Sequence, residues 1–470
     1  KTLYTFAMTI RPDKKIASFH ACDNSHGTHC AGISTGFQLF GEKTLHGIAP
    51  GAQVISAKIG VGTLSGGATT TGSMKRAYEY GVKYAKEHDI HIVFSMSYGV
   101  DSEIEGRSDI EQFLNKIMQE NENVVIVTSN GNSGPGISSA GNPSCASRIM
   151  SIGALMPIGL ARDTYGYAND GDRLMHFTSR GGESGKPDCI APGAAASSVP
   201  MHAKGENMWG TSMACPQVSG AAAILISACE QEKIPWNGAL IQRALTQSAD
   251  PLPGYTPLDQ GTGVVNIPRA FEIMKIYTQR DEAVKVLDYE VETFCPQYND
   301  GKNENAYWRT GGYFPTEKKQ TFRVKAIFPN KATADERANF YRAYSLKCDQ
   351  PWFKLDKSST YIRGEHSAKI GGYYQADKLK QPGLYVATIS GYAKTGAGKN
   401  IPDFQILNTV IIPHLFDTSN QYKLKIENKT LKSGEYHRYF VQVPPAASTM
   451  TIELAPSQGK WCGIYGYIYD

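Results

Sequence analysis

The first half of the chain alternates short apolar runs with longer amphipathic stretches. Met74, Tyr78, Val82 and Ala85, for example, recur at the spacing of one helix face. The pattern predicts strands at residues 53–59, 91–98, 124–129 and 149–155, and helices at residues 72–87, 109–121, 211–230 and 237–248. Strands that alternate with helices form parallel sheets with right-handed crossovers. We therefore expect an α/β domain of three layers, with a mostly parallel sheet, ending near residue 278.

The pattern changes beyond about residue 280. Helical spacing fades, and short runs rich in Tyr, Phe, Thr and Val alternate with Gly, Pro and Asn turns. The clearest runs lie at residues 321–328, 384–392 and 436–443, and residues 414–419 have the composition of a linker. Short strands separated by turns are typical of a β-sandwich, so we expect β-sandwich structure to follow the α/β domain.

Composition narrows the class of protein. The 470 residues are 41% hydrophobic and 20% charged, which fits a globular protein of more than one domain. The net charge of +4 is spread without a dense Lys/Arg block, so we expect no nucleic acid partner. No apolar stretch approaches the roughly 20 residues of a membrane span, so we expect no membrane contact. The nine cysteines are odd in number and lack C-x-x-C spacing, which favours reduced thiols in a cytoplasmic protein.

Residues 210–216, Gly-Thr-Ser-Met-Ala-Cys-Pro, place a serine where a loop enters a predicted long helix. A serine hydroxyl is a weak nucleophile until a base removes its proton. At a helix N-terminus the N–H of Ser212 lacks an intrahelical partner and the helix dipole adds positive potential, so an oxyanion is favoured there. Pro216 is expected in the first turn, where its missing N–H costs little. Taken alone, Ser212 is more often a simple helix cap.

Two further segments supply a base and an oxyanion donor. Residues 24–32 contain His-Gly-Thr-His at the start of an expected helix, which would project His26 from the first turn. Residues 128–135 form a Gly-rich loop after a strand, and the side-chain amide of Asn132 can donate to a developing oxyanion. Each motif alone also has an ordinary structural interpretation, as a histidine near a helix start or an asparagine in a turn.

In the order His26, Asn132, Ser212, the three motifs resemble the subtilisin family of serine peptidases. H-G-T-H-x-A-G and G-T-S-M-A-x-P are specific signatures of that family, and a G-N-x-G loop lies between them. The resemblance implies that His26 is the base, Ser212 the nucleophile and Asn132 an oxyanion donor. It also implies that the segment Ser97, Tyr98 and Gly99 binds the substrate main chain as an added β-strand, the alternative being an ordinary strand end.

Other chemistries fit the motifs less well. No G-x-S-x-G elbow surrounds Ser212, and the histidine precedes the serine, against the order in α/β-hydrolases. Cys22, His26, His29 and Cys30 fall within nine residues and raise the possibility of zinc. Neither H-E-x-x-H nor a second ligand pair at finger spacing accompanies them. We therefore expect no metal and no cofactor.

The triad carboxylate is missing from its expected place. The family has an apolar run ending in Asp-Ser/Thr-Gly upstream of the histidine, whereas residues 1–25 contain only Asp13 and Asp23. Asp13 lies in an expected turn between two short strands, and Asp23 resembles a helix cap. We expect the aspartate to precede Lys1, with residues 1–21 ending an insertion, and the residues shown to be nearly inactive alone. In subtilisin itself, loss of the aspartate lowers turnover about 3 × 10⁴-fold.

That insertion, with several further segments, resembles the tripeptidyl-peptidase II branch of the family. The similar segments are I-A-P-G-A-Q-V-I-S-A-K-I-G at residues 48–60, S-M-S-Y-G at 95–99, S-R-G at 179–181, A-P-G at 191–193, and the β-rich residues 352–392 and 434–445. The resemblance implies tripeptide release from free N-termini and a very large homo-oligomer. We expect a peptidase domain at 1–278, an Ig-like β-sandwich at 279–415, and a truncated jelly-roll or galactose-binding-like β-domain at 416–470.

The chain departs from that branch at two positions. The branch carries two glutamates that bind the free amino group of the substrate, whereas this chain has Ala-Thr-Thr-Thr at residues 68–71 and Val100. Asp101, Glu103 and Glu105 lie nearby as possible substitutes. An ammonium group in a partly buried site without a carboxylate is costly. Three hypotheses therefore stay open: a tripeptide-releasing exopeptidase, a subtilisin-like endopeptidase, and an inactive pseudo-peptidase that acts as an assembly subunit.

Cys30 adjoins the motif of the base, at a position where the family usually has valine. A thiol beside the base would make activity sensitive to alkylating reagents. The simpler interpretation is a small buried residue that only packs.

Overall fold

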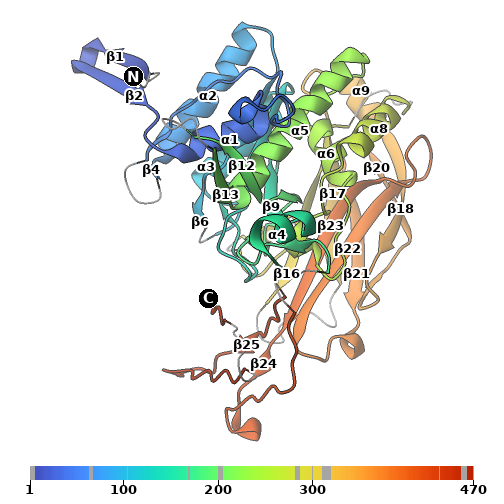
Figure 1. Cartoon of the computed structure of the whole chain (residues 1–470). Coiled ribbons are helices and arrows are strands. Elements are labelled where there is room, and N and C mark those ends of the chain that lie inside the picture. The colour runs from blue at the N-terminus through green and yellow to red at the C-terminus, as the bar shows by residue number, and fades with distance from the viewer. Residues whose placement is uncertain are drawn as a thin grey trace.

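The computed structural model describes residues 6–62, 67–102, 104–167, 170–199, 205–280, 286–298, 300–309, 319–432, 435–456 and 463–468. The first half forms a three-layer α/β unit, and two five-stranded sheets follow it (Figure 1). The predicted fold class is confirmed. The predicted domain boundaries stay predictions.

The α/β unit is built on a mostly parallel sheet. Its parallel strands are β5 (Ile92–Met96), β7 (Val124–Ser129), β9 (Met150–Met156) and β11 (Cys189–Pro192), and β10 (Arg173–Leu174) pairs antiparallel with β9. Every residue of β7 is buried, as expected for a strand covered on both faces. Val124 and Ile126 share a core with one helical layer, and Val125 and Val127 share a core with the other. Alternate side chains of β7 therefore pack against the two helical layers on opposite faces of the sheet.

Helices cover both faces of this sheet. One layer contains α2 (Thr71–Glu87) and α3 (Asp109–Glu120), and the other contains α5 (Thr211–Gln231), α6 (Gly238–Gln247) and α8 (Ile267–Thr278). The other described helices of this unit are α1 (Ser25–Thr35), α4 (Ile158–Tyr165) and α7 (Pro257–Gln260). Helix α5 is long and apolar enough to cross a membrane, but 67% of its apolar window is buried inside this fold. It is the central helix of a core.

The two sheets of the second half face each other. One contains β14 (Asp288–Phe294), β15 (Lys302–Asn303), β17 (Gln320–Ile327), β19 (Phe353–Leu355) and β21 (Ala368–Tyr374). The other contains β16 (Ala306–Trp308), β18 (Tyr341–Cys348), β20 (Ser359–Arg363), β22 (Gly383–Ala393) and β23 (Pro402–Ile412). Phe322 and Ile370 from the first sheet share one core with Tyr344, Ile389 and Ile406 from the second. This arrangement confirms the predicted β-sandwich.

Three predicted elements are wrong or only partly right. Residues 53–59 form no strand, and β3 (Gly60–Val61) begins only after them. Val54 and Ile55 are exposed there, because no described strand pairs with this apolar run. Of residues 436–443, only β25 (Val441–Gln442) is a strand, and it pairs with β24 (His414–Leu415) inside the predicted linker.

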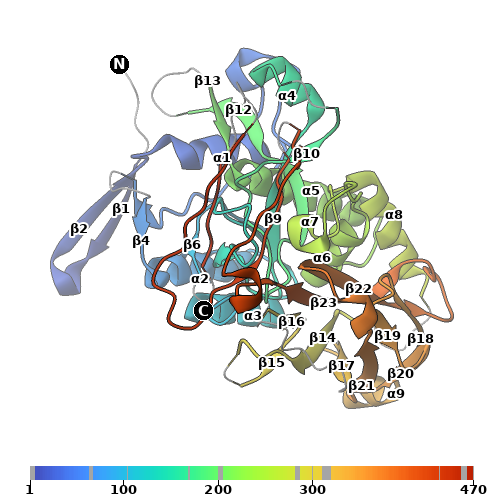
Figure 2. The same cartoon turned by 90° about the horizontal axis from the view of Figure 1, so that it is seen from below.

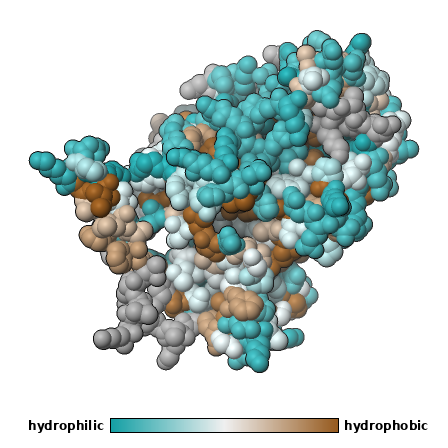
Figure 3. Space-filling view, turned by 90° about the horizontal axis from the view of Figure 1, so that it is seen from above, coloured by the Kyte–Doolittle hydropathy of each residue, from teal (hydrophilic) through white to brown (hydrophobic). Residues whose placement is uncertain are grey.

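A hairpin of β1 (Phe6–Arg11) and β2 (Ile16–Ala21) projects from the α/β unit (Figure 1). Asp13 lies in the short helical turn Pro12–Lys14 that joins the strands, which confirms the expected turn. Apolar side chains are exposed on the hairpin, and Figure 3 shows brown surface on this projection. The most exposed are Phe6, Ile10 and Phe19.

Candidate active site

The candidate nucleophile lies at the start of α5. Gly210 caps this helix, so Ser212 is its second residue. Pro216 lies inside the helix and not in its first turn, which corrects the prediction. Because proline has no N–H, the carbonyl of Ser212, four residues earlier, has no donor within the helix. The Ser97 hydroxyl donates to that oxygen at 2.9 Å and the Cys30 thiol at 3.3 Å.

Asn132 lies in the loop after β7 and faces the start of α5. Its Oδ1 accepts hydrogen bonds from the N–H and the hydroxyl of Thr211, both at 3.0 Å. The Thr211 hydroxyl also accepts from the N–H of Gly131 at 3.2 Å. Because Thr211 N–H can only donate, the amide oxygen is assigned, and the Nδ2 donors face the other way.

Gly210 shows where those donors point. A Cβ atom built at Gly210 would lie 3.5 Å from Asn132 Nδ2, 3.7 Å from Asn132 Oδ1 and 3.7 Å from the Ser212 nitrogen. The two N–H donors therefore flank one small space beside the serine. An oxyanion hole consists of such preorganised donors around the point where negative charge develops.

The candidate base lies in the first turn of α1. The side chain of Asn24 caps this helix by accepting from the N–H of His26 at 2.9 Å, so Asp23 is not the cap that the sequence predicted. The sulfur of Cys30 lies 4.0 Å from His26 Nδ1. Burial lowers the pKa of His26, and His29 nearby lowers it further. A lowered pKa keeps the imidazole neutral, as a proton acceptor must be.

Cys30 lies between His26 and the backbone of Ser212. Its thiol contacts His26 Nδ1 on one side and the carbonyl of Ser212 on the other. Burial raises the pKa of Cys30 to about 12, so the sulfur stays protonated. A buried, protonated thiol reacts poorly with alkylating reagents, which favours the packing role for Cys30.

No described carboxylate pairs with His26. Asp23 instead accepts from Lys58 at 2.5 Å and from the N–H of Gly62 at 3.1 Å. Asp13 lies in the turn of the projecting hairpin. Neither aspartate that the sequence offered therefore orients the base in this structure.

The four side chains considered for zinc do not converge. His29 Nε2 lies 2.8 Å from the carbonyl oxygen of Glu206, and the Cys22 thiol donates to the carbonyl of Asn24. Cys30 turns to Ser212. His26 Nδ1 lies 4.0 Å from the Cys30 sulfur, and among the described residues no group of three or more His, Cys, Asp or Glu side chains is placed to hold a metal ion.

The predicted substrate segment follows β5 directly. Tyr98 is half-buried and Gly99 is exposed, while the Ser97 side chain holds the Ser212 carbonyl. After the segment, β6 (Val100–Asp101) pairs with β8 (Gly141–Asn142). The role of this segment in binding a peptide main chain stays a prediction.

Sequence reasoning missed Thr211 and the tethers on the Ser212 carbonyl. The signal for the tethers was present, because Pro216 stands four residues after Ser212 and removes the helical donor to its carbonyl. The partners Ser97 and Cys30 lie 115 and 182 residues away along the chain. Only the fold reveals them.

Comparison with known proteins agrees with this geometry. The model of the subtilase family matches residues 9–267. The chain is 26% identical to tripeptidyl-peptidase 2 of Drosophila melanogaster, over 99% of this chain and 32% of that protein. It is 29% identical to pyrolysin of Pyrococcus furiosus, over 88% of this chain and 32% of that protein.

A solved structure of tripeptidyl peptidase 2 superposes with a TM-score of 0.69 over 88% of this chain and 32% of that one, at 24% identity. This similarity concerns the fold. The chain spans about a third of the length of the curated relatives named above. Since the family model covers more than half of the chain and all three motifs, the chain belongs to the subtilase family of serine peptidases.

Proposed function

We propose that the chain cleaves peptides through an acyl-enzyme formed on Ser212. His26 accepts the hydroxyl proton as Ser212 attacks the scissile carbonyl, and later gives it to the leaving amine. Asn132 Nδ2 and the N–H of Ser212 bind the oxyanion. The observation that carries this proposal is the anchoring of Asn132 by Thr211, which points its free amide donors at the space beside Ser212.

A fluorophosphonate probe tests the nucleophile in the full-length protein. We expect labelling of Ser212, loss of labelling in Ser212→Ala, and much slower labelling in His26→Ala. In Asn132→Ala, turnover should fall about 10²–10³-fold, because one oxyanion donor is lost. Absence of labelling in a folded full-length sample would support the pseudo-peptidase that acts as an assembly subunit, the alternative motivated by the lack of a described carboxylate beside His26.

For specificity we propose an exopeptidase that releases tripeptides from free N-termini. The support is the similarity to tripeptidyl-peptidase 2 of Drosophila melanogaster along 99% of this chain. Against it stands the absence of carboxylates at residues 68–71 and at Val100. Of the possible substitutes, Glu105 is buried and Glu103 lies outside the described residues. Asp101 accepts from the Ser133 hydroxyl at 2.8 Å, next to Asn132.

Matched peptides distinguish this proposal from a subtilisin-like endopeptidase. One peptide has a free amino terminus, and its partner is the same sequence with an acetylated terminus. Release of tripeptides from the free form alone supports the exopeptidase. Equal internal cleavage of both forms supports the endopeptidase and would refute tripeptide release.

Two further proposals concern assembly and compartment. The similarity to tripeptidyl-peptidase 2 supports a large homo-oligomer, which light scattering on the purified protein would measure. The eight described cysteines are free thiols, which supports a cytoplasmic location. Cell fractionation with a tagged full-length protein tests that location.

A further inference from the structure

The last described residues of the chain return to the loop that carries Asn132. In Figure 2 the dark red C-terminal trace crosses the lower face of the α/β unit. Tyr436, Arg438 and Tyr467 contact that unit through hydrogen bonds that span 177 to 334 residues of sequence. Residues 436–443 were expected to be a strand, yet most of them form none. Their side chains are instead used at this contact.

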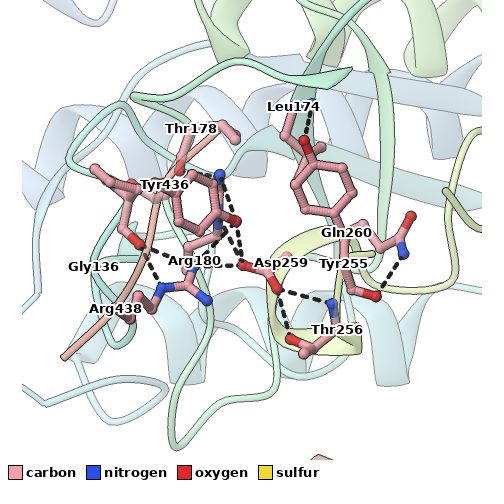
Figure 4. Close-up of polar contacts among 12 residues, drawn as sticks. Gly136, Leu174, Thr178, Arg180, Tyr255, Thr256, Asp259, Gln260, Tyr436 and Arg438 are labelled. Atoms are coloured by element: carbon pink, nitrogen blue, oxygen red, sulfur yellow. Dashed lines mark hydrogen bonds and ion pairs between the residues drawn. The ribbon is translucent and has the colours of Figure 1, made fainter. Parts of the chain in front are cut away.

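The first part of the contact is a buried carboxylate between two guanidinium groups. Arg180 has 0% of its surface exposed and Asp259 has 2%. Oδ1 of Asp259 accepts from Arg180 at 3.1 Å, from Arg438 at 2.5 Å and from the Tyr436 hydroxyl at 3.0 Å (Figure 4). One carboxylate carries too little charge to neutralise two guanidinium groups. It also cannot accept from all of their N–H donors, so the remaining donors need other acceptors such as carbonyl oxygens.

Arg438 donates hydrogen bonds to a carbonyl oxygen on the loop that carries Asn132. Its Nε and Nη2 both donate to the oxygen of Pro135, at 3.1 and 3.0 Å. This contact fixes the C-terminal side of the loop. The Asp259 carboxylate, held by Thr256 and Arg180 from the α/β unit, keeps the guanidinium of Arg438 in position.

Tyr467 fixes the same loop closer to Asn132. Its hydroxyl donates to the carbonyl of Ser133 at 2.9 Å. Its ring lies against Gly136, where an added Cβ would come within 2.5 Å of ring carbons. Tyr467 therefore adds a contact from the end of the described chain to Ser133, whose N–H and hydroxyl already donate to Ser179 and Asp101 of the α/β unit.

We propose that Arg438 and Tyr467 are positioning residues that hold the Asn132 loop in its oxyanion-binding geometry, so that the C-terminal segment controls turnover. This inference rests on the proposed role of Asn132. Asn132 itself is exposed, and among the described residues its side chain hydrogen-bonds to Thr211 alone. A shift of the loop by about 1 Å would move Nδ2 out of hydrogen-bond range of the oxyanion, and such misplacement can cost about 10²-fold in rate.

Arg438→Gln and Tyr467→Phe in the full-length protein test the proposal with a chromogenic peptide substrate. An oxyanion donor acts in the transition state, so kcat should fall while KM stays nearly constant. We expect a loss of about 10-fold for Tyr467→Phe and up to about 10²-fold for Arg438→Gln, because displacing the Asn132 donor should cost no more than the roughly 10²–10³-fold of removing it. Arg438→Lys, which keeps the positive charge and a single donor group, should recover part of the rate. Affinity for a peptide boronic acid should fall in parallel.

The double variants with Asn132→Ala distinguish positioning from general damage to the fold. If Arg438 and Tyr467 act through Asn132, their substitution should lower kcat hardly further in the Asn132→Ala background. Tyr467→Phe removes only a hydroxyl, so it remains testable where Arg438→Gln folds poorly. Full multiplicative loss in the double variants overturns the proposal. Wild-type kcat in both single variants overturns it as well.

Glu435→Gln is the matched control. Glu435 pairs with Arg173 on β10 at 3.4 Å, a contact of the same segment with the α/β unit that involves no residue of the Asn132 loop. We expect wild-type kcat in this variant, and a loss equal to that of Arg438→Gln would contradict the specific role of the loop contact. If Asn132→Ala alone keeps full activity, the oxyanion role fails first. If Asn132→Ala lowers kcat but the Arg438 and Tyr467 variants keep wild-type kcat, the oxyanion role of Asn132 stands and only the positioning role of Arg438 and Tyr467 fails.

Discussion

At the scale of single residues, Gly210 borders both proposed oxyanion donors. Its φ of +151° lies in a region that favours glycine, and an added Cβ would stand within 4 Å of both proposed oxyanion donors. Gly210→Ala should therefore lower kcat about 10²-fold or more, because the methyl group takes the space of the oxyanion. Steady-state kinetics on a chromogenic peptide measure the effect.

Gly166→Ala is the control for backbone strain. Gly166 ends α4 with φ of +67° and has open space around a built Cβ. Alanine there should lower the melting temperature slightly and leave kcat unchanged. A similar loss of kcat in both variants would show that strain, and not the blocked space, explains the effect at Gly210.

Glu105 is a buried carboxylate away from the proposed chemistry. Its Oε2 accepts from the N–H of Ser184 at 2.8 Å. Burial and the neighbouring Glu183 raise the pKa of Glu105 from 4.5 to about 8. Between these values the folded state holds a proton that the unfolded state has released, so stability falls as pH rises from about 4.5 to 8.

Glu105→Gln removes that titration and keeps an acceptor for Ser184. We expect a small difference from wild type near pH 5 and a gain on the order of 4 kcal/mol near pH 8, since the pKa of Glu105 is raised from 4.5 to about 8 and one pKa unit is worth about 1.4 kcal/mol. Thermal melts across this pH range measure it. The exposed Glu232→Gln should leave the profile unchanged, and a Glu105→Gln profile parallel to wild type would contradict the argument.

At the scale of elements, a side chain from the segment after β5 replaces a hydrogen bond that the proline in α5 removes. Pro216 leaves the Ser212 carbonyl without its helical donor, and Ser97 supplies a hydroxyl to it at 2.9 Å. Ser97→Ala leaves only the weaker thiol of Cys30. We expect a loss of about 1 kcal/mol, as for a typical hydrogen bond, together with a lower kcat.

Pro216→Ala should reduce the cost of Ser97→Ala, because alanine supplies an N–H four residues after Ser212. A double-mutant cycle on thermal stability tests this coupling. Ser95→Ala, near the end of β5 two residues earlier, serves as the control, since its hydroxyl contacts Cys215 at 3.9 Å and not the Ser212 carbonyl. Additive effects of Ser97→Ala and Pro216→Ala would contradict the compensation.

The same elements show what the sequence could predict. Strand β7 was predicted residue for residue, because it is buried on both faces and its apolar run has sharp ends. The run at residues 53–59 has a similar apolar composition, but no described strand pairs with it. The sequence of a single segment does not show whether another strand will pair with it. His26, Asn132 and Ser212 could be located from the sequence, because each lies in a short motif of neighbouring residues. Contacts such as Tyr467 to Ser133 follow from the fold and leave no local signal.

At the scale of the whole molecule, the α/β unit and the β-sandwich are joined by a buried charge cluster. Asp403 on β23 is 2% exposed and pairs with Arg280, just after α8, at 2.8 Å and with Arg342 on β18 at 2.5 Å. Burial alone would raise the pKa of Asp403, but Arg280, Arg342 and Arg243 outweigh it and hold the pKa below 3.8. The carboxylate thus neutralises arginines from both parts.

Asp403→Asn should uncouple these two parts. The amide leaves buried guanidinium groups without a counter-charge, a change that costs about 3–5 kcal/mol in comparable sites. We expect calorimetry to show a lower first transition and a wider separation between the unfolding of the sandwich and of the α/β unit. Because the pKa of Asp403 is lowered, its contribution in wild type is complete above about pH 4 and is lost as pH falls further, so the difference between wild type and variant should shrink in acid. Glu365→Gln, which breaks an exposed pair with Arg337 on the same sandwich, should leave both transitions unchanged. A single unshifted transition in Asp403→Asn would show that apolar contacts, and not this cluster, hold the two parts together.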